Sequence, residues 1–335
     1  MRIVRPEGNG VVTIGEALDP IPGPGEVVIE TAASGLCGSE LNSYRTTGSE
    51  TGNGGHEAVG TVAQLGEGVT DLALGQRVGV SAIAGCGECS HCAKGQYTWC
   101  PSFRFYGSMH AERFLAAANA CHPLPDDVPW GVAVLLTGDG LGVPYHTSTK
   151  IASPEIGTVA VFGVGPIGLG SVLIQSHLGR RVIAVDPSVY RLEKAACLGA
   201  ESTVNPGYCD PVQHVRDFGG GAGADVCIEA AGRAETALAC FAAVRTAGTV
   251  VFNGEQSALS LSPSEHFIRR DITAVGSWFY HFSEFAPMLN LYRAGLRVAD
   301  LISHRFPFED AAAAYEAFSA GRTAKVVLDY TGGNA

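Results

Sequence analysis

The alternation of hydrophobic and polar positions changes character once along the chain, near residue 145. Before that point, short β-prone runs are separated by connections rich in glycine and proline, and few stretches show the helical spacing of apolar positions. The runs that predict strands are 11–14, 26–30, 59–66 and 76–80. This part of the chain is therefore expected to form a small β-barrel-like domain.

Beyond residue 145, apolar runs alternate with amphipathic segments. The predicted strands are 158–162, 181–185, 202–204, 225–229, 249–252 and 272–275, and the predicted helices are 167–178, one that begins at Asp210-Pro211, and 235–244. Asp210 is a typical N-cap, and Pro211 suits the first helical position. Strands that alternate with helices predict a doubly wound parallel sheet in an α/β fold. The tail adds a predicted helix over 308–320 and a strand over 325–330.

The strand over 158–162 runs into a Gly-x-Gly-x-x-Gly turn, and the next helix begins there. Gly163 permits the tight turn, Gly165 lets backbone N–H groups approach a pyrophosphate, and Gly168 lets the helix pack closely on the strand. Pro166 and Ile167 complete the loop. The segment is therefore a candidate dinucleotide-binding loop.

An acidic residue strengthens this interpretation. Asp186 ends the next predicted strand, 18 residues after Gly168, where a carboxylate can accept hydrogen bonds from the adenosine ribose. It would also repel a 2′-phosphate, so NAD is favoured over NADP. Arg191 is assigned to the same cofactor site. In a chain with 44 glycines, the alternative is an ordinary strand–helix turn with an aspartate on the surface.

Composition narrows the class of protein. The 335 residues suggest two domains, and the formal net charge of −11 argues against a nucleic acid or an anionic membrane as partner. The N-terminus lacks the apolar core of a signal peptide, and no apolar run reaches membrane-spanning length. Ten cysteines without an export signal point to thiolates and metal rather than disulfides, and so to the cytoplasm.

Four of these cysteines form the ladder Cys-x-x-Cys-x-x-Cys-x7-Cys. They are Cys86, Cys89, Cys92 and Cys100. Four thiolates at such short spacing make a closed tetrahedral zinc site, which is structural because no position remains for a substrate. An iron–sulfur cluster, which also uses four cysteines, is the alternative.

Cys37, His56 and Asp139 are candidates for a second metal site. A thiolate, an imidazole and a carboxylate with one open position make a catalytic zinc set. The three residues are far apart in the sequence, so their spacing alone cannot join them.

The resemblance of the chain to a known family links these three residues. The chain resembles the zinc-dependent medium-chain dehydrogenases of the alcohol dehydrogenase superfamily over essentially its whole length. The motifs that carry the resemblance are CGSE at 37–40, GHE at 55–57, the cysteine ladder, LPDDV at 124–128, GDGLGVPYH at 138–146, GVGPIG at 163–168 and KVVLDY at 325–330.

The resemblance implies that Cys37, His56 and Asp139 bind catalytic zinc, with Glu57 as a further ligand or just behind the metal. It implies two zinc ions per chain, one catalytic and one structural. It also implies a discontinuous GroES-like catalytic domain, 1–145 and 279–335, and a Rossmann domain over 146–278. In the family, chains assemble as dimers or tetramers, so a homodimer or homotetramer is expected.

The implied reaction is hydride transfer between an alcohol and NAD, with zinc as a Lewis acid on the substrate oxygen. Ser39 resembles the hydroxyl that accepts the alcohol proton, and Lys325 the base that reaches the cofactor pyrophosphate. Asn42 stands where the proton relay usually ends in a histidine, so either water or another histidine such as His281 would complete it, or proton release would be slow.

The expected substrate is a hydroxylated secondary alcohol, such as a sugar derivative, a cyclitol or a polyol, or its ketone. A short-chain alcohol or aldehyde and a threonine-like amino alcohol are the alternatives. A zinc-independent reductase and a non-redox dinucleotide-binding protein are the alternatives from other classes.

Overall fold

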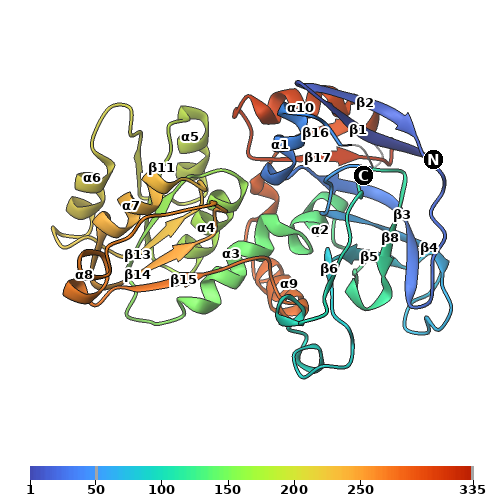
Figure 1. Cartoon of the computed structure of the whole chain (residues 1–335), viewed down its shortest axis with the longest axis horizontal. Helices are drawn as coiled ribbons and strands as arrows, with labels where there is room; N and C mark the ends of the chain where they lie inside the picture. Colours follow the sequence, from blue (N-terminus) through green and yellow to red (C-terminus); the bar gives the residue numbers. More distant parts are fainter. Residues whose placement is uncertain (50–51, 333–335) are drawn as a thin grey trace. The chain divides into compact units, whose positions relative to one another are not determined.

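The computed structural model describes residues 1–49 and 52–332, and these residues form two compact units (Figure 1). The first unit comprises residues 1–142, 280–294 and the C-terminal segment from Val298. The second comprises Val143–Phe279 and Gly295–Arg297. The chain therefore leaves the first unit, builds the second, and returns.

The second unit is the predicted α/β domain, built on a six-stranded parallel sheet. Its strands are β10 (Thr158–Phe162), β11 (Arg181–Val185), β12 (Ser202–Val204), β13 (Ala224–Glu229), β14 (Val244–Phe252) and β15 (Thr273–Gly276). The order in the sheet is β12-β11-β10-β13-β14-β15. Because the chain order reverses between β10 and β13, this is the doubly wound dinucleotide-binding topology.

In this unit the described residues form the three predicted helices and two more. They are α4 (Pro166–His177), α5 (Val189–Cys197), α6 (Pro211–Phe218), α7 (Ala234–Ala243) and α8 (Pro263–His266). Asp210 caps α6 as predicted, and its side chain accepts hydrogen bonds from the backbone N–H groups of Val212 and Gln213. Residues of β10 and β13 are almost fully buried, as expected for central strands of a parallel sheet covered on both faces.

The first unit is built around the long strand β3 (Glu26–Gly35), which pairs with β4, β8 and β17. The main sheet has the order β16-β17-β3-β4-β5-β9, and β8 also pairs with β3. The other strands of this sheet are β4 (Ala58–Leu65), β5 (Arg77–Val80), β8 (Arg113–Ala117), β9 (Cys121–Pro123), β16 (Ile302–Pro307) and β17 (Lys325–Asp329). Two small antiparallel pairs, β1 (Arg2–Gly8) with β2 (Val11–Glu16) and β6 (Ile83–Ala84) with β7 (Arg104–Phe105), complete the strands. This is the expected GroES-like domain.

The helices of the first unit are few and short. They are α1 (Leu41–Arg45), α2 (Trp130–Leu136), α9 (Phe285–Arg293) and α10 (Ala311–Ser319), while α3 (Asp139–Lys150) begins in the first unit and ends in the second along the chain. The pattern did not predict α2 or α3. All residues of α2 after Trp130 are buried, so it shows no polar face. Pro144 lies inside α3, where propensity disfavours a helix.

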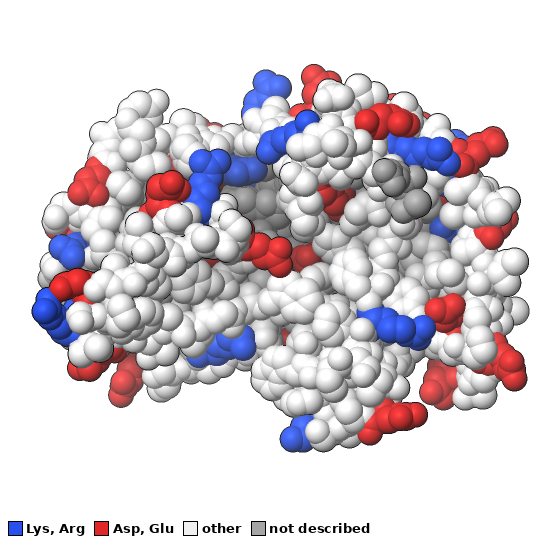
Figure 2. All heavy atoms as spheres, viewed as in Figure 1, with Lys and Arg blue, Asp and Glu red and all other residues white. Residues whose placement is uncertain are grey.

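Charged side chains of both signs are interspersed on the face of the molecule drawn in Figure 2. Among the described residues, no helix combines the length and the apolar character that crossing a bilayer requires.

Candidate metal centres and cofactor site

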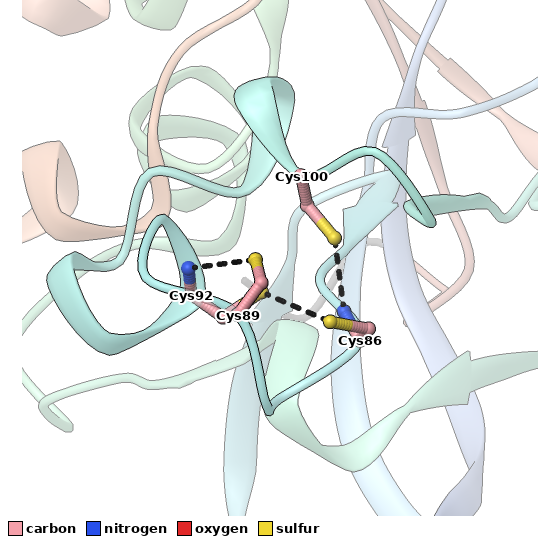
Figure 3. A group of neighbouring side chains, drawn as sticks. All are labelled: Cys86, Cys89, Cys92 and Cys100. Carbon is pink, nitrogen blue, oxygen red and sulfur yellow. Dashed lines mark hydrogen bonds between the residues drawn. The ribbon is translucent and has the colours of Figure 1, made fainter.

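The cysteine ladder closes on itself in space. The side chains of Cys86, Cys89, Cys92 and Cys100 point toward one another (Figure 3), and their sulfur atoms all lie within 4.8 Å of one another. The sulfur of Cys92 is 3.8 Å from that of Cys86 and 3.5 Å from that of Cys89. Four thiolates around one zinc at about 2.3 Å would stand about 3.8 Å apart, so the sulfur atoms fit a single tetrahedral ion.

Backbone groups of the same loop support the thiolates. The N–H of Cys92 donates to the sulfur of Cys89, and the N–H of Cys86 donates to the sulfur of Cys100, each at 3.4 Å. Hydrogen bonds from the backbone N–H groups of Glu88 and Cys89 lower the pKa of the Cys86 thiol to about 6, whereas burial raises the pKa of Cys92 to about 12. A bound cation would stabilise all four groups as thiolates.

The second cluster brings together residues that the sequence keeps apart. We call Cys37, His56, Glu57 and Asp139 the mixed cluster; one ligand atom from each lies within 4.8 Å of the others. The Nε2 atom of His56 is 3.0 Å from the Oδ2 atom of Asp139, and the sulfur of Cys37 is 3.9 Å from the same oxygen. Cys37 follows β3, His56 precedes β4 and Asp139 begins α3, so three separate elements supply the set.

The residues of the mixed cluster fit a metal ion. The Oδ1 atom of Asp139 is buried and has no hydrogen-bond partner among the described residues, which is costly unless a cation occupies the site. The donors are a sulfur, an imidazole nitrogen and a carboxylate oxygen, the set that zinc accepts in catalytic sites. A zinc here would leave a coordination position for a substrate.

His56 is held in position for such a role. Its Nδ1 atom lies 2.8 Å from the carbonyl oxygen of Gly54, so Nδ1 carries the proton and Nε2 faces Asp139. Burial lowers the pKa of His56, but hydrogen bonds to Asp139 and Cys37 outweigh it and raise the pKa well above its usual value. Protons therefore compete strongly for the position that a metal would take.

Glu57, the fourth member of the mixed cluster, also forms a buried ion pair with Lys325. Its second carboxylate oxygen accepts a hydrogen bond of 3.4 Å from the N–H of Gly140. Burial lowers the pKa of Lys325, but the charges of Glu57 and Cys37 outweigh it and raise the pKa. A Cβ atom at Gly138 would lie 2.5 Å from Glu57, and one at Gly35 would lie 2.7 Å from Lys325, so both glycines make room for the pair.

The sequence did not predict the partnership of Lys325 with Glu57. Lys325 is 2% exposed. An ammonium group has three N–H donors, and the ion pair with Glu57 occupies one of them. The predicted contact of Lys325 with the cofactor pyrophosphate stays a prediction.

Two residues of the expected proton relay lie apart in the first unit. Ser39 is exposed, two positions after Cys37, and keeps its predicted role as a hypothesis. His281 does not fit the relay, because its Nδ1 atom is 2.8 Å from the hydroxyl of Thr98 and its ring packs edge-on against Trp99 in the ladder loop. His281 therefore supports the cysteine ladder.

The glycine loop has the predicted local geometry. Gly163 has a φ of +87°, where a side chain is strained, and a Cβ atom there would lie 2.7 Å from Ala231. A Cβ atom at Gly168 would lie 2.0 Å from the carbonyl oxygen of Gly163. Gly165 is the N-cap of α4, and near it only the guanidinium of Arg191 comes within 4 Å of a Cβ position. The loop is thus open where a pyrophosphate would lie, with Pro166 and Ile167 in the first turn of the helix.

Asp186 lies beside this loop. One oxygen of its carboxylate accepts a hydrogen bond of 2.9 Å from the N–H of Val164, and the other accepts one of 2.8 Å from the N–H of Ser188. The carboxylate thereby links the glycine loop to the N-terminus of α5, where Arg191 lies. The residues predicted to bind the cofactor after β10 and after β11 therefore lie next to each other.

Sequence reasoning missed two residues next to the mixed cluster, Glu40 and His110. They stand 70 positions apart, and no spacing in the sequence links them. The two side chains form a buried pair, with the Nε2 atom of His110 2.9 Å from the Oε2 atom of Glu40. Burial raises the pKa of Glu40, but the charge and hydrogen bond of His110 outweigh it and lower the pKa to about 2.

Comparison with known proteins agrees with this geometry. Residues 23–126 match the model of the alcohol dehydrogenase GroES-like domain, and residues 166–294 match that of the zinc-binding dehydrogenases. An L-threonine 3-dehydrogenase of Pyrococcus furiosus is 31% identical over 325 residues, which cover 92% of each chain.

Two solved structures share the fold. The alcohol dehydrogenase of a Thermus species superposes with a TM-score of 0.88 at 28% identity and covers 98% of this chain and 99% of its own. Galactitol-1-phosphate dehydrogenase from Escherichia coli has a TM-score of 0.86 at 27% identity and covers 98% of this chain and 100% of its own. The chain therefore belongs to the zinc-dependent medium-chain dehydrogenases, the alcohol dehydrogenase superfamily.

Proposed function

We propose that this chain is an NAD-dependent zinc alcohol dehydrogenase that acts on a hydroxylated secondary alcohol or its ketone. The observation that carries the proposal is the mixed cluster, in which a thiol, an imidazole and a carboxylate with an unpartnered oxygen converge in a buried place. A zinc-independent reductase or a non-redox dinucleotide-binding protein would have no use for such a set.

In this proposal, Cys37, His56 and Asp139 hold the catalytic zinc. When bound, zinc supplies Lewis-acid chemistry that favours loss of the alcohol proton near neutral pH. Glu57 stays paired with Lys325 beside the three ligands, and the ammonium group of Lys325 offsets the negative charge of Glu57. Ser39 is exposed two positions after Cys37, and its hydroxyl would accept the alcohol proton while passing its own proton on toward water.

Elemental analysis combined with activity measurement tests the assignment. The purified protein is expected to contain two zinc ions per chain and to reduce NAD when given a secondary alcohol. One zinc per chain and no oxidation of any alcohol would favour the alternatives from other classes.

The preference for NAD rests on Asp186. Its carboxylate faces the loop that would hold the pyrophosphate, and a negative charge there opposes a 2′-phosphate. Replacing Asp186→Ser should shift the ratio of kcat/KM values for NAD and NADP toward NADP by about 10- to 100-fold. Asp186→Asn is the matched variant, because it removes the charge and keeps the size. An unchanged ratio in both variants would mean that Asp186 does not contact the ribose.

The substrate class draws support from two observations. The relatives reported above are named for threonine and for galactitol 1-phosphate, and both compounds carry several polar groups. Within the first unit, the ring of Phe105 is half exposed and its centroid lies 5.9 Å from that of His56, which offers an apolar surface beside a ligand. A panel of cyclitols, sugar alcohols, threonine and simple secondary alcohols would rank these classes by kcat/KM; highest activity on short primary alcohols would contradict the proposal.

We also expect a homodimer or homotetramer in a reducing compartment such as the cytoplasm. β15 is an edge strand with three of its four residues exposed, so its free edge can pair with another copy. All ten cysteines are free thiols. Sedimentation velocity should give a mass of two or four times 34.7 kDa, and a monomer would contradict this expectation.

A further inference from the structure

His110 stands at the junction of two loops that carry candidate zinc ligands. Its side chain is completely buried in the first unit. The Nε2 atom faces the carboxylate of Glu40, and the Nδ1 atom lies 2.8 Å from the hydroxyl of Ser34, near the end of β3. Both ring nitrogens thus have partners, so the orientation of the ring is determined.

Glu40 connects this histidine to the loop of Cys37. Its Oε1 atom accepts a hydrogen bond of 3.0 Å from the backbone N–H of Cys37. Its Oε2 atom accepts the bond from His110 and a second one of 2.7 Å from the hydroxyl of Tyr315 in α10. The carboxylate of Glu40, which is 2% exposed, therefore connects the backbone of Cys37 to α10 through Tyr315. Through His110 it also connects to the end of β3.

The backbone of His110 connects to the loop of His56 through Asn53. The side-chain oxygen of Asn53 accepts hydrogen bonds from the N–H groups of Gly55 and His110, at 3.0 and 3.2 Å. Its side-chain nitrogen donates to the carbonyl oxygen of His110 at 3.1 Å. The residue that precedes His56 is thus hydrogen-bonded to the same asparagine as His110.

Steric contacts add to these hydrogen bonds. A Cβ atom at Gly55 would lie 2.6 Å from the ring of His110, and one at Gly54 would lie 3.1 Å from the Cγ atom of Glu40. The His56 loop therefore packs directly on the Glu40–His110 pair. Gly54 also supplies the carbonyl oxygen that orients His56.

We propose that Glu40 and His110 are a positioning pair, which sets the distance and orientation of Cys37 relative to His56 and thereby the affinity of the mixed cluster for zinc. Neither residue reaches the metal itself. The inference rests on the zinc site proposed above, and it assigns to these residues a role that the metal-ligand motifs do not contain.

The rate at which the holoenzyme loses zinc to a chromogenic chelator tests the pair. In the wild-type protein we expect two phases, one for each metal, and the phase that is missing in Asp139→Ala belongs to the mixed cluster. Glu40→Gln keeps the size but removes the charge, and it should speed this phase by about 10- to 100-fold while the phase of the cysteine ladder is unchanged. His110→Gln should act in the same direction.

Two tyrosines provide graded variants. Tyr315→Phe removes one hydrogen bond from Glu40 and should give a smaller acceleration of the same phase. Tyr106→Phe is the matched control, because its hydroxyl donates to Glu26 at 2.9 Å and has no part in the network of Glu40 and His110, and it should leave both phases unchanged.

A second readout follows the geometry of the ligands. In the cobalt-substituted protein, the absorption band that Asp139→Ala removes should shift in Glu40→Gln. Equal acceleration of both zinc phases, or no change in either, would overturn the positioning role. If Glu40→Gln does not fold, an unchanged release rate in Tyr315→Phe would overturn it. A wild-type protein with one zinc per chain would instead refute the proposed function.

Discussion

The cysteine ladder and the mixed cluster are built in opposite ways. The ladder takes four like ligands from fifteen consecutive residues, and one of them, Cys86, is exposed. The mixed cluster takes unlike ligands from positions 37 to 139, and three of its four members are buried. The ladder would saturate a bound ion with sulfur, whereas the mixed cluster has a lysine next to it and an oxygen of Asp139 that lacks a hydrogen-bond partner among the described residues.

The difference shows what each arrangement requires of the fold. A short loop can close four thiolates around an ion with little help from the rest of the domain. The mixed cluster needs β3, the loop before β4, α3 and β17 in the right places, together with the network of Glu40 and His110. A site that must leave one position open for a substrate depends on distant support, because its own ligands do not fill the metal.

One short segment of the first unit nevertheless touches both regions. The hydroxyl of Tyr280 donates to the carbonyl oxygen of Thr137, two residues before Asp139, at 2.7 Å. The next residue, His281, bonds Thr98 in the ladder loop, and Phe282 stacks on Tyr97 at 5.0 Å between ring centroids. The two clusters are therefore mechanically connected through residues 280–282.

The largest expected effect comes from removing a metal ligand of the mixed cluster, because only this cluster is expected to take part in the reaction. Asp139→Ala should reduce the zinc content from two to one and lower kcat/KM by about 1,000-fold or more, because Lewis-acid stabilisation is worth several kcal/mol. Cys100→Ser should also lower the zinc content to one but chiefly reduce Tm. Zinc analysis, kinetics and thermal unfolding of both variants check this.

The assignment of a catalytic role to the mixed cluster and a structural role to the ladder would be wrong in either of two cases. One is that Asp139→Ala keeps its activity; the other is that Cys100→Ser abolishes activity while the protein stays folded and keeps zinc in the mixed cluster.

The next effect concerns Lys325, the buried cation that pairs with Glu57 of the mixed cluster. Lys325→Met leaves Glu57 buried without its partner, and the free energy of unfolding should fall by about 3–5 kcal/mol. The double variant Lys325→Met/Glu57→Gln removes both charges and should recover most of this loss. Urea unfolding of the three proteins measures the difference; a single variant as stable as wild type would show that the pair is not buried in solution.

The smallest expected effect is a dependence of stability on pH that arises at His122, which packs against the segment 280–282. His122 is stacked against Phe282 and Phe285, with ring centroids 4.0 and 4.4 Å apart, and burial lowers its pKa to about 3. The unfolded chain binds a proton at this residue near pH 6.5, whereas the folded chain does not until about pH 3, so acid favours unfolding in this window. At pH 5 the free energy of unfolding is therefore lower by about 2 kcal/mol than it would be without this titration.

His122→Phe should flatten the dependence of unfolding free energy on pH between 7 and 5, and His177→Gln, at an exposed position, should not. Identical slopes in wild type and His122→Phe would show that His122 is accessible to protons in the folded protein.

Sequence patterns predicted the parallel sheet well because its central strands are continuous apolar runs and the helix α6 has a clear cap. The strand over 202–204 and the cap at Asp210 were confirmed residue by residue. Patterns failed at α2 and α3, where full burial and an internal proline hide the helical period. They also left His281 as one candidate for the end of the proton relay, whereas in the fold its ring is hydrogen-bonded to Thr98 of the ladder loop.

The sequence by itself determined what depends on neighbours along the chain: the ladder, the glycine loop and the acid at the end of the second strand. Only the tertiary structure decided that Cys37, His56 and Asp139 meet, that Lys325 pairs with Glu57, and that Glu40 and His110 join the two ligand loops. The reason is physical. Short-range geometry follows from local spacing, whereas contacts across a hundred or more residues are chosen by packing and by the need to give every buried charge a partner.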